Sequence, residues 1–337
     1  MALTDLMATA EGWQWITNGD DLIEVWVCHV PVESNASIYG GMTLRLDLTP
    51  RSVADEIRAL VPEYYETISH GEYRPVFRAG GEVTLTADES GQECLDKAIA
   101  EAGADAQGVF AVADAEHSGT APGGFGHVGE PCTDPPCPVS ATGRSAYIGA
   151  SDFHPDWGEQ GPMDLVEHEL GHMLGWQHSG VARGGQYLSA LDVKSNSAAP
   201  RDTNPDARDA PATLALNGLL AGWLPVADVW PAPARGGTVV LAPSTGESGT
   251  RLAVVGLGGN QFLTIEVLTA DGYNAHLPVS GVAVHIVQVA DGEIDDMEPL
   301  VGETPFADLL QVGDTFDTNG WRITIADGWS VTIQPLG

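Results

Sequence analysis

The segment from His168 to His178 constrains this chain more than any other. It reads H-E-x-x-H-x-x-G-x-x-H. His168 and His172 are four residues apart, so on a helix they lie on the same face and can bind one metal ion together. Gly175 suits the left-handed turn that ends a helix without strain. We therefore expect a helix that stops near Gly175, after which the chain turns back toward the same face.

His178 follows that turn and can supply a third imidazole nitrogen. Three neutral imidazoles leave the fourth tetrahedral position open, which is typical of a catalytic zinc site rather than a structural one. We predict His168, His172 and His178 as the ligands of one catalytic Zn²⁺. The alternative is a buried helix with two core histidines, for which the glutamate, the glycine and the third histidine would all be coincidences.

Glu169 directly follows the first of these histidines, where its carboxylate can reach a water molecule on the metal. Zinc held by three histidines lowers the pKa of such a water to near neutral. Glu169 can take the proton from that water and return it to the leaving amine. The pattern therefore predicts peptide hydrolysis without a covalent intermediate, with Glu169 as the general base.

The eleven residues from His168 to His178 resemble the long zinc signature of the metzincin metallopeptidases. The resemblance implies three histidine ligands, Glu169 as the general base and Gly175 as the turn residue. It also implies a twisted sheet whose antiparallel edge strand binds an extended protein or peptide substrate. The segment Gly124–Gly129 resembles that edge, and pairing of the substrate with it would be β-augmentation.

A second resemblance places the chain nearest the immune inhibitor A and gametolysin types. Residues 187–195 resemble their segment of a tyrosine followed by Asp-Val-Met, and residues 219–224 resemble their Leu-Gly-Trp helix end. Lys194 stands where these proteins carry the methionine of a turn beneath the zinc. A cation there is unfavourable unless it is paired or turned away, and Asp192 is a candidate partner. Tyr187 is a candidate helper for the oxyanion, although a packed or exposed loop tyrosine is the alternative.

The pattern of elements predicts an α+β protein with two domains. Residues 1–226 are expected to form a metzincin-like catalytic domain with a twisted mixed sheet. Residues 227–337 carry short strand candidates separated by turn signals, which predicts a C-terminal β-sandwich. The expected strands are 21–31, 42–48, 83–86, 108–114, 124–129, 144–151, 238–242, 251–255, 261–268, 281–289, 315–316, 321–326 and 330–334. The expected helices are 51–69, 92–102, 163–174 and 214–224.

The charge of the chain is strongly negative, with 14 Lys and Arg against 47 Asp and Glu. Such a surface repels nucleic acid and anionic lipid, and no apolar run is long enough to span a membrane. We therefore expect neither nucleic acid nor a membrane span among the partners; the sequence sets no oligomeric state. The acidic loops, such as 291–296, permit structural Ca²⁺, with a solvated turn as the alternative.

The four cysteines predict two disulfides and an extracellular, secreted protein. Cys132 and Cys137 can close a short ring, which would leave Cys28 with Cys94; four buried free thiols are the alternative. Residues 1–5 lack the features of a signal peptide, so we expect either prior removal of a signal and pro-segment or another export route.

The leading hypothesis is a secreted zinc endopeptidase. The alternative is a catalytically impaired metzincin-like protein whose β domain docks a protein or glycan, and a zinc hydrolase of small amides is a third possibility. The seven remaining histidines are predicted to be surface or core residues, although two of them can face the cleft, His127 and His154.

Overall fold

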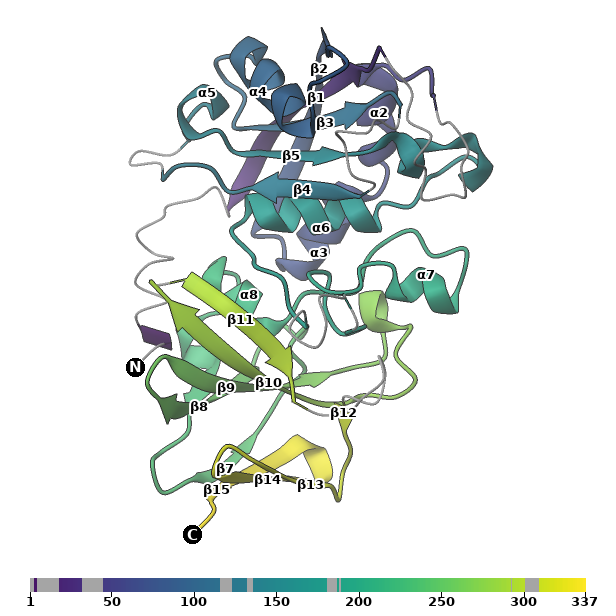
Figure 1. Ribbon diagram of the computed structural model, residues 1–337. Helices are drawn as coiled ribbons and strands as arrows, with labels where there is room; N and C mark the ends of the chain where they lie inside the picture. Colours follow the sequence, from purple (N-terminus) through teal and green to yellow (C-terminus); the bar gives the residue numbers. More distant parts are fainter. Residues whose placement is uncertain are drawn as a thin grey trace. The chain divides into compact units, whose positions relative to one another are not determined.

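The computed structural model of the chain describes residues 3–4, 18–31, 45–115, 123–131, 136–180, 187, 189–291, 293–300 and 309–337 (Figure 1). The chain divides into two compact units. The first, here called the helix-and-sheet unit, comprises Trp13–Trp176 and Asp206–Ala210. The second, the β-rich unit, comprises Met1–Gly12, Gln177–Pro205 and Pro211–Gly337. The predicted division at residue 226 stays a prediction.

A five-stranded mixed sheet forms the centre of the helix-and-sheet unit, in the order β2-β1-β3-β5-β4. The first four strands in this order are parallel, whereas β4 is antiparallel to β5 and lies at the edge. The edge strand predicted from Gly124 is therefore present. The strands are β1 (Gly19–His29), β2 (Tyr73–Thr84), β3 (Gly108–Ala113), β4 (Gly124–His127) and β5 (Ser145–Ile148).

The helices of this unit are α2 (Pro50–Ile57), α3 (Val61–Ile68), α4 (Gly91–Glu101), α5 (Val139–Thr142) and α6 (Asp164–Met173). The single helix expected over 51–69 is wrong, because α2 and α3 are separate. Pro62 lies in the first turn of α3, where its missing N–H costs nothing, whereas inside a continuous helix it would remove a hydrogen bond and clash with the preceding turn. Thr49 and Ser52 form a capping box at the start of α2.

Two sheets dominate the β-rich unit, with orders β11-β10-β9-β8-β6 and β13-β14-β15-β7, and β12 pairs with β10. One buried cluster draws on both sheets, including Val255 and Ile265 from the first and Ile323 and Val331 from the second. The strands are β6 (Val229–Pro231), β7 (Gly237–Val240), β8 (Leu252–Gly258), β9 (Gln261–Leu268), β10 (Gly281–Ala290), β11 (Glu293–Pro299), β12 (Leu309–Leu310), β13 (Thr315–Thr318), β14 (Trp321–Ala326) and β15 (Ser330–Pro335). The helices are α7 (Ala199–Thr203) and α8 (Ala215–Leu220).

Short 3₁₀ turns connect several elements, at Ala150–Phe153, Pro155–Trp157, Val226–Asp228, Gly272–Asn274 and Asp327–Trp329. With its mixed sheets and few helices the chain is an α+β protein, as expected. Of the predicted strand 42–48, residues 42–44 lie outside the described residues. Arg45 forms an isolated bridge with Ala115, and the Leu46 N–H donates to the carbonyl of Asp114.

The predicted disulfide between Cys28 and Cys94 is present and joins β1 to α4. Cys137 is also disulfide-bonded, while Cys132 lies outside the described residues, as does His117. Within the part of the chain that the structure describes, none of the helices combines the length and the apolar character needed to cross a membrane.

Candidate metal centre

Helix α6 carries the first two histidines and ends as the sequence predicts. Its last residue is Met173, and Gly175 has φ +82°, the left-handed conformation that glycine adopts without strain. The Gly175 N–H donates to the carbonyl of His172, and the Trp176 N–H donates to the carbonyl of Gly171. These bonds satisfy carbonyls at the helix end and turn the chain back toward the helix.

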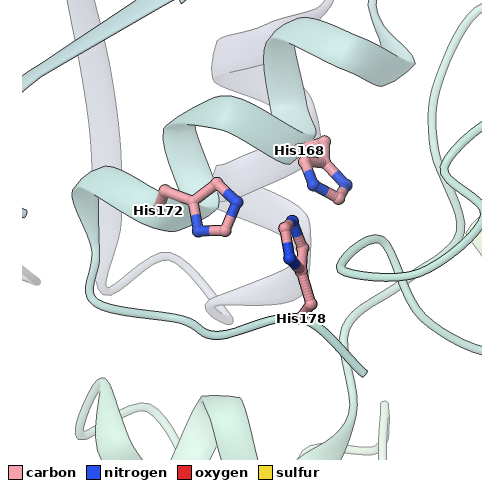
Figure 2. Close-up of side chains that lie close together, drawn as sticks. All are labelled: His168, His172 and His178. Atoms are coloured by element: carbon pink, nitrogen blue, oxygen red, sulfur yellow. The ribbon is translucent and has the colours of Figure 1, made fainter. Parts of the chain in front are cut away.

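The three predicted ligands come together. One nitrogen from each of His168, His172 and His178 lies within 4.8 Å of the other two. The rings face a common point, two of them from α6 and the third from the segment that follows it (Figure 2). Among the described residues, these three histidines are the one group of His, Cys, Asp or Glu side chains with metal-binding geometry. The cluster can therefore hold a metal ion.

The protonation of the cluster suits a metal. His172 Nδ1 lies 2.9 Å from the carbonyl oxygen of Trp176. A carbonyl only accepts, so Nδ1 carries the proton and Nε2 is left with its lone pair for the ion. Burial, with a contribution from the charge of Lys194, lowers the pKa of His178 to about 4. His178 is therefore neutral at neutral pH, as a ligand must be.

Glu169 lies beside the cluster on the same helix. Its side chain is almost fully buried, and its Oε2 is 4.0 Å from His172 Nε2. This placement brings the predicted general base next to the nitrogen of His172 that would bind an ion. A carboxylate there can exchange a proton with a molecule bound between the histidines.

The edge strand β4 packs directly on α6, as seen in Figure 1. A Cβ atom on Gly124 would lie 2.7 Å from Glu169 Oε1, and one on Gly126 would lie 2.7 Å from His172 Cβ. A Cβ on Gly124 would also lie 2.6 Å from the Tyr147 carbonyl oxygen, so any larger residue at these positions would displace the helix, the carboxylate or the neighbouring strand β5. The two glycines therefore set the distance between the edge strand and the centre.

The turn that contains Lys194 is buried in the β-rich unit. Lys194 is 0% exposed, and its carbonyl accepts the N–H of Ser179, the residue after the third histidine. The Asp192 carboxylate accepts bonds from the Ser179 hydroxyl, at 2.6 Å, and from the Thr213 hydroxyl, at 3.3 Å. Burial raises the pKa of Asp192, and the charge of Lys194 opposes this rise. The predicted partner thus lies close enough to Lys194 to feel its charge, but it also anchors the segment after His178.

Tyr187 lies against the third histidine, with ring centroids 4.9 Å apart and an edge-on angle of 79°. Its side chain is 48% exposed. Other predicted candidates are elsewhere. His127 points to Gln92, and His154 accepts the N–H of Asp156 at the start of a 3₁₀ turn. The structure therefore brings neither of them to the cluster.

Sequence reasoning missed a buried ion pair that contacts the end of α6. Arg144 donates to Asp21, and the two are 123 residues apart in the sequence. Both lie in segments predicted as strands, where their charge was unremarkable. A charged residue at the start of each of two apolar strand segments was the one available signal.

No family model and no curated protein matches this chain. One solved chain, described as "Structure of a chaperone-substrate complex", is similar with 14% identity and a TM-score of 0.25. The similarity covers 61% of this chain and 36% of that one, so this chain spans about a third of its length. A likeness this weak supports no argument about fold or function.

Proposed function

We propose that this protein is a zinc-dependent endopeptidase of the metzincin type, with Glu169 as its general base. The observation that carries the proposal is the convergence of His168, His172 and His178, with Glu169 Oε2 only 4.0 Å from His172 Nε2. Among the described residues no fourth side chain joins the three imidazole nitrogens, which matches the donor set of a catalytic zinc. When bound, zinc supplies a Lewis acid that activates water and polarises a carbonyl.

The residues of the chain have separate tasks in this proposal. The Trp176 carbonyl fixes the tautomer of His172, and burial keeps His178 neutral. Glu169 accepts a proton from the attacking water and returns it to the leaving nitrogen of the peptide. The free edge of β4, held close to α6 by Gly124 and Gly126, would pair with an extended protein or peptide substrate.

The further features that we propose follow the same resemblance. A metzincin-like catalytic domain fits a mixed sheet with an antiparallel edge strand beside the metal helix. The all-β part from residue 227 fits a β-sandwich, since one core draws on both of its sheets. The disulfide between Cys28 and Cys94 supports an extracellular location.

The proposal is tested with two variants and two matched controls. Glu169→Gln should bind one zinc per chain and lose cleavage of casein, because the carboxamide cannot accept the proton. His172→Ala should lose both zinc and cleavage. The controls change an exposed glutamate of α4 (Glu101→Gln) and an exposed histidine that lies outside both the cluster and β4 (His70→Asn), and both should behave like the wild type. Cleavage that survives in purified Glu169→Gln or His172→Ala protein would refute the mechanism.

A second candidate is a metzincin-like binding protein without hydrolytic activity. The buried Lys194 favours it, because its charge acts on His178 and disfavours a dication nearby. Its β domain would then dock a protein or glycan. Wild-type protein that holds one zinc per chain but cleaves no member of a peptide library would support this candidate over the first.

A further inference from the structure

Buried polar side chains contact the backbone of α6 on both sides of its two histidines. The Tyr65 hydroxyl donates to the carbonyl oxygen of Glu167, at 2.6 Å, one residue before the first ligand. Arg144 Nε donates to the carbonyl oxygen of Met173, at 2.8 Å, one residue after the second ligand. The segment of helix that carries both ligands is therefore held at its two ends.

These two contacts belong to one connected network in the helix-and-sheet unit. Arg144 donates from Nη1 and Nη2 to the two carboxylate oxygens of Asp21, at 2.8 and 2.7 Å. The Tyr73 hydroxyl donates to the same carboxylate, at 2.6 Å. The ring of Tyr73 packs edge-on against Tyr65, with centroids 5.6 Å apart. All four side chains are almost completely buried.

The network also reaches the residue that sets the tautomer of the second ligand. The ring of Tyr65 packs against Trp176, with centroids 6.2 Å apart. The carbonyl of Trp176 accepts the Nδ1 proton of His172. A shift of Tyr65 would therefore move the backbone of α6 and also Trp176, whose carbonyl orients His172.

A gain in stability does not by itself explain the buried pair of Arg144 and Asp21. Burying an arginine and an aspartate costs desolvation that their attraction only partly repays, and well-packed apolar residues would often do as well. An arginine offers something that apolar residues lack. Its rigid fork bonds Asp21 with two nitrogens while Nε bonds the helix end, where a cation also interacts favourably with the helix dipole.

We propose that this network positions the metal-binding helix and holds His168 and His172 in ligand geometry. The inference rests on the proposed metal centre. We regard its members as positioning residues, because their hydrogen bonds described above run to the backbone of α6 and to one another. They are Asp21, Tyr65, Tyr73 and Arg144. Changing residues that orient metal ligands typically weakens metal binding by about 10–100-fold.

The main test is Arg144→Lys, which keeps the charge but loses the fork. One ammonium group can reach Asp21 or the carbonyl of Met173, but it cannot reproduce all three bonds. We expect the dissociation constant for zinc, measured by competition with a chromophoric chelator, to rise by about tenfold or more. The absorption bands of Co²⁺ placed in the same site should shift, since they report ligand geometry.

The matched control is Arg78→Lys. Arg78 donates to Glu24, which lies on β1 like Asp21, and to Asp105. The substitution therefore makes the same chemical change in a second ion-pair network, in which the guanidinium group does not bond to α6. The control should bind zinc like the wild type, even if thermal unfolding of the metal-free protein shows lower stability. Tyr65→Phe keeps the ring and removes only the hydroxyl, and it should weaken zinc binding less than Arg144→Lys. It serves as the test should Arg144→Lys fail to fold.

The outcomes separate this inference from the proposed function. If the wild type binds one zinc per chain and both Arg144→Lys and Tyr65→Phe keep its affinity and cobalt spectrum, the positioning role is refuted while the metal centre stands. If Arg78→Lys weakens zinc binding as much as Arg144→Lys, the effect is general destabilisation and the positioning role is again refuted. If the wild type binds no zinc, the metal centre itself is wrong, and the inference falls with it.

Discussion

Glu266 is a buried carboxyl group whose replacement by glutamine should stabilise the β-rich unit in a pH-dependent way. Its Oε2 accepts the N–H of Ala215, at 2.9 Å, in the first turn of α8. Burial raises the pKa of Glu266 from 4.5 to about 7, although the bond from Ala215 opposes the rise. At neutral pH and above, the folded protein must therefore hold a carboxylate in a place that favours the neutral acid.

The size of the effect follows from the two pKa values. Between pH 4.5 and about 7 the folded state keeps the proton while the unfolded chain has lost it. The contribution of Glu266 to the free energy of unfolding is therefore fully present below pH 4.5. It falls as the pH rises and is lost above about pH 7. At about 1.4 kcal/mol per pKa unit, the difference amounts to about 3 kcal/mol. Glutamine keeps an oxygen acceptor for Ala215 and carries no charge, so Glu266→Gln escapes this loss.

Urea unfolding of the wild type and of Glu266→Gln, followed by tryptophan fluorescence across this pH range, measures the effect. The two proteins should be equally stable near the low end, and the variant should be more stable by about 3 kcal/mol near pH 8. The exposed Glu101→Gln should show no such divergence. A constant difference at every pH, or a variant that is less stable near pH 8, would show that Glu266 is not held as a neutral acid.

Three further changes have defined outcomes. Gly124→Ala should lower kcat and leave zinc content unchanged, because its Cβ would lie 2.7 Å from Glu169 Oε1 and 2.6 Å from the Tyr147 carbonyl oxygen, so that the carboxylate and β4 must shift; an unchanged kcat would show that both have room to move. Burial lowers the pKa of His285 to about 4, so its contribution is present above pH 6.5 and lost as the pH falls toward 4. In the same urea series His285→Leu should gain up to about 3 kcal/mol over the wild type toward low pH, the opposite slope to Glu266→Gln. Replacing Cys28 and Cys94 by alanine opens a link between residues 66 apart and should cost about 2–5 kcal/mol of unfolding free energy; a smaller loss would mean that packing alone holds β1 to α4.

The histidine cluster was predictable because the signal for it lies in one short stretch of the sequence. His168, Glu169 and His172 lie within two turns of α6, where helical spacing places them, and Gly175 follows directly and turns the chain back. The edge strand from Gly124 was predictable for a similar reason, since a short segment between turn signals carries its own boundaries. In both cases the residues that lie together in the structure are also close together in the sequence.

Other features depend on partners that are far away in the sequence. No local signal pairs Arg144 with Asp21, because the pairing arises from the order of strands in the sheet. The helix expected over 51–69 was wrong for a local reason instead. Its apolar spacing is regular throughout, but Pro62 overrides periodicity by removing one donor, and the chain restarts as α3.

The edge strand beside the metal helix has one more consequence. Gly124 and Gly126 face α6, while Phe125 between them stacks on Tyr147 on the other side of the sheet, with centroids 5.2 Å apart. A slip of β4 by one residue along β5 would exchange the two sides and drive the Phe125 ring into Glu169. The helix that carries His168 and His172 therefore also disfavours a one-residue error in the pairing of the outermost strand, because only glycine fits at the two positions that face it.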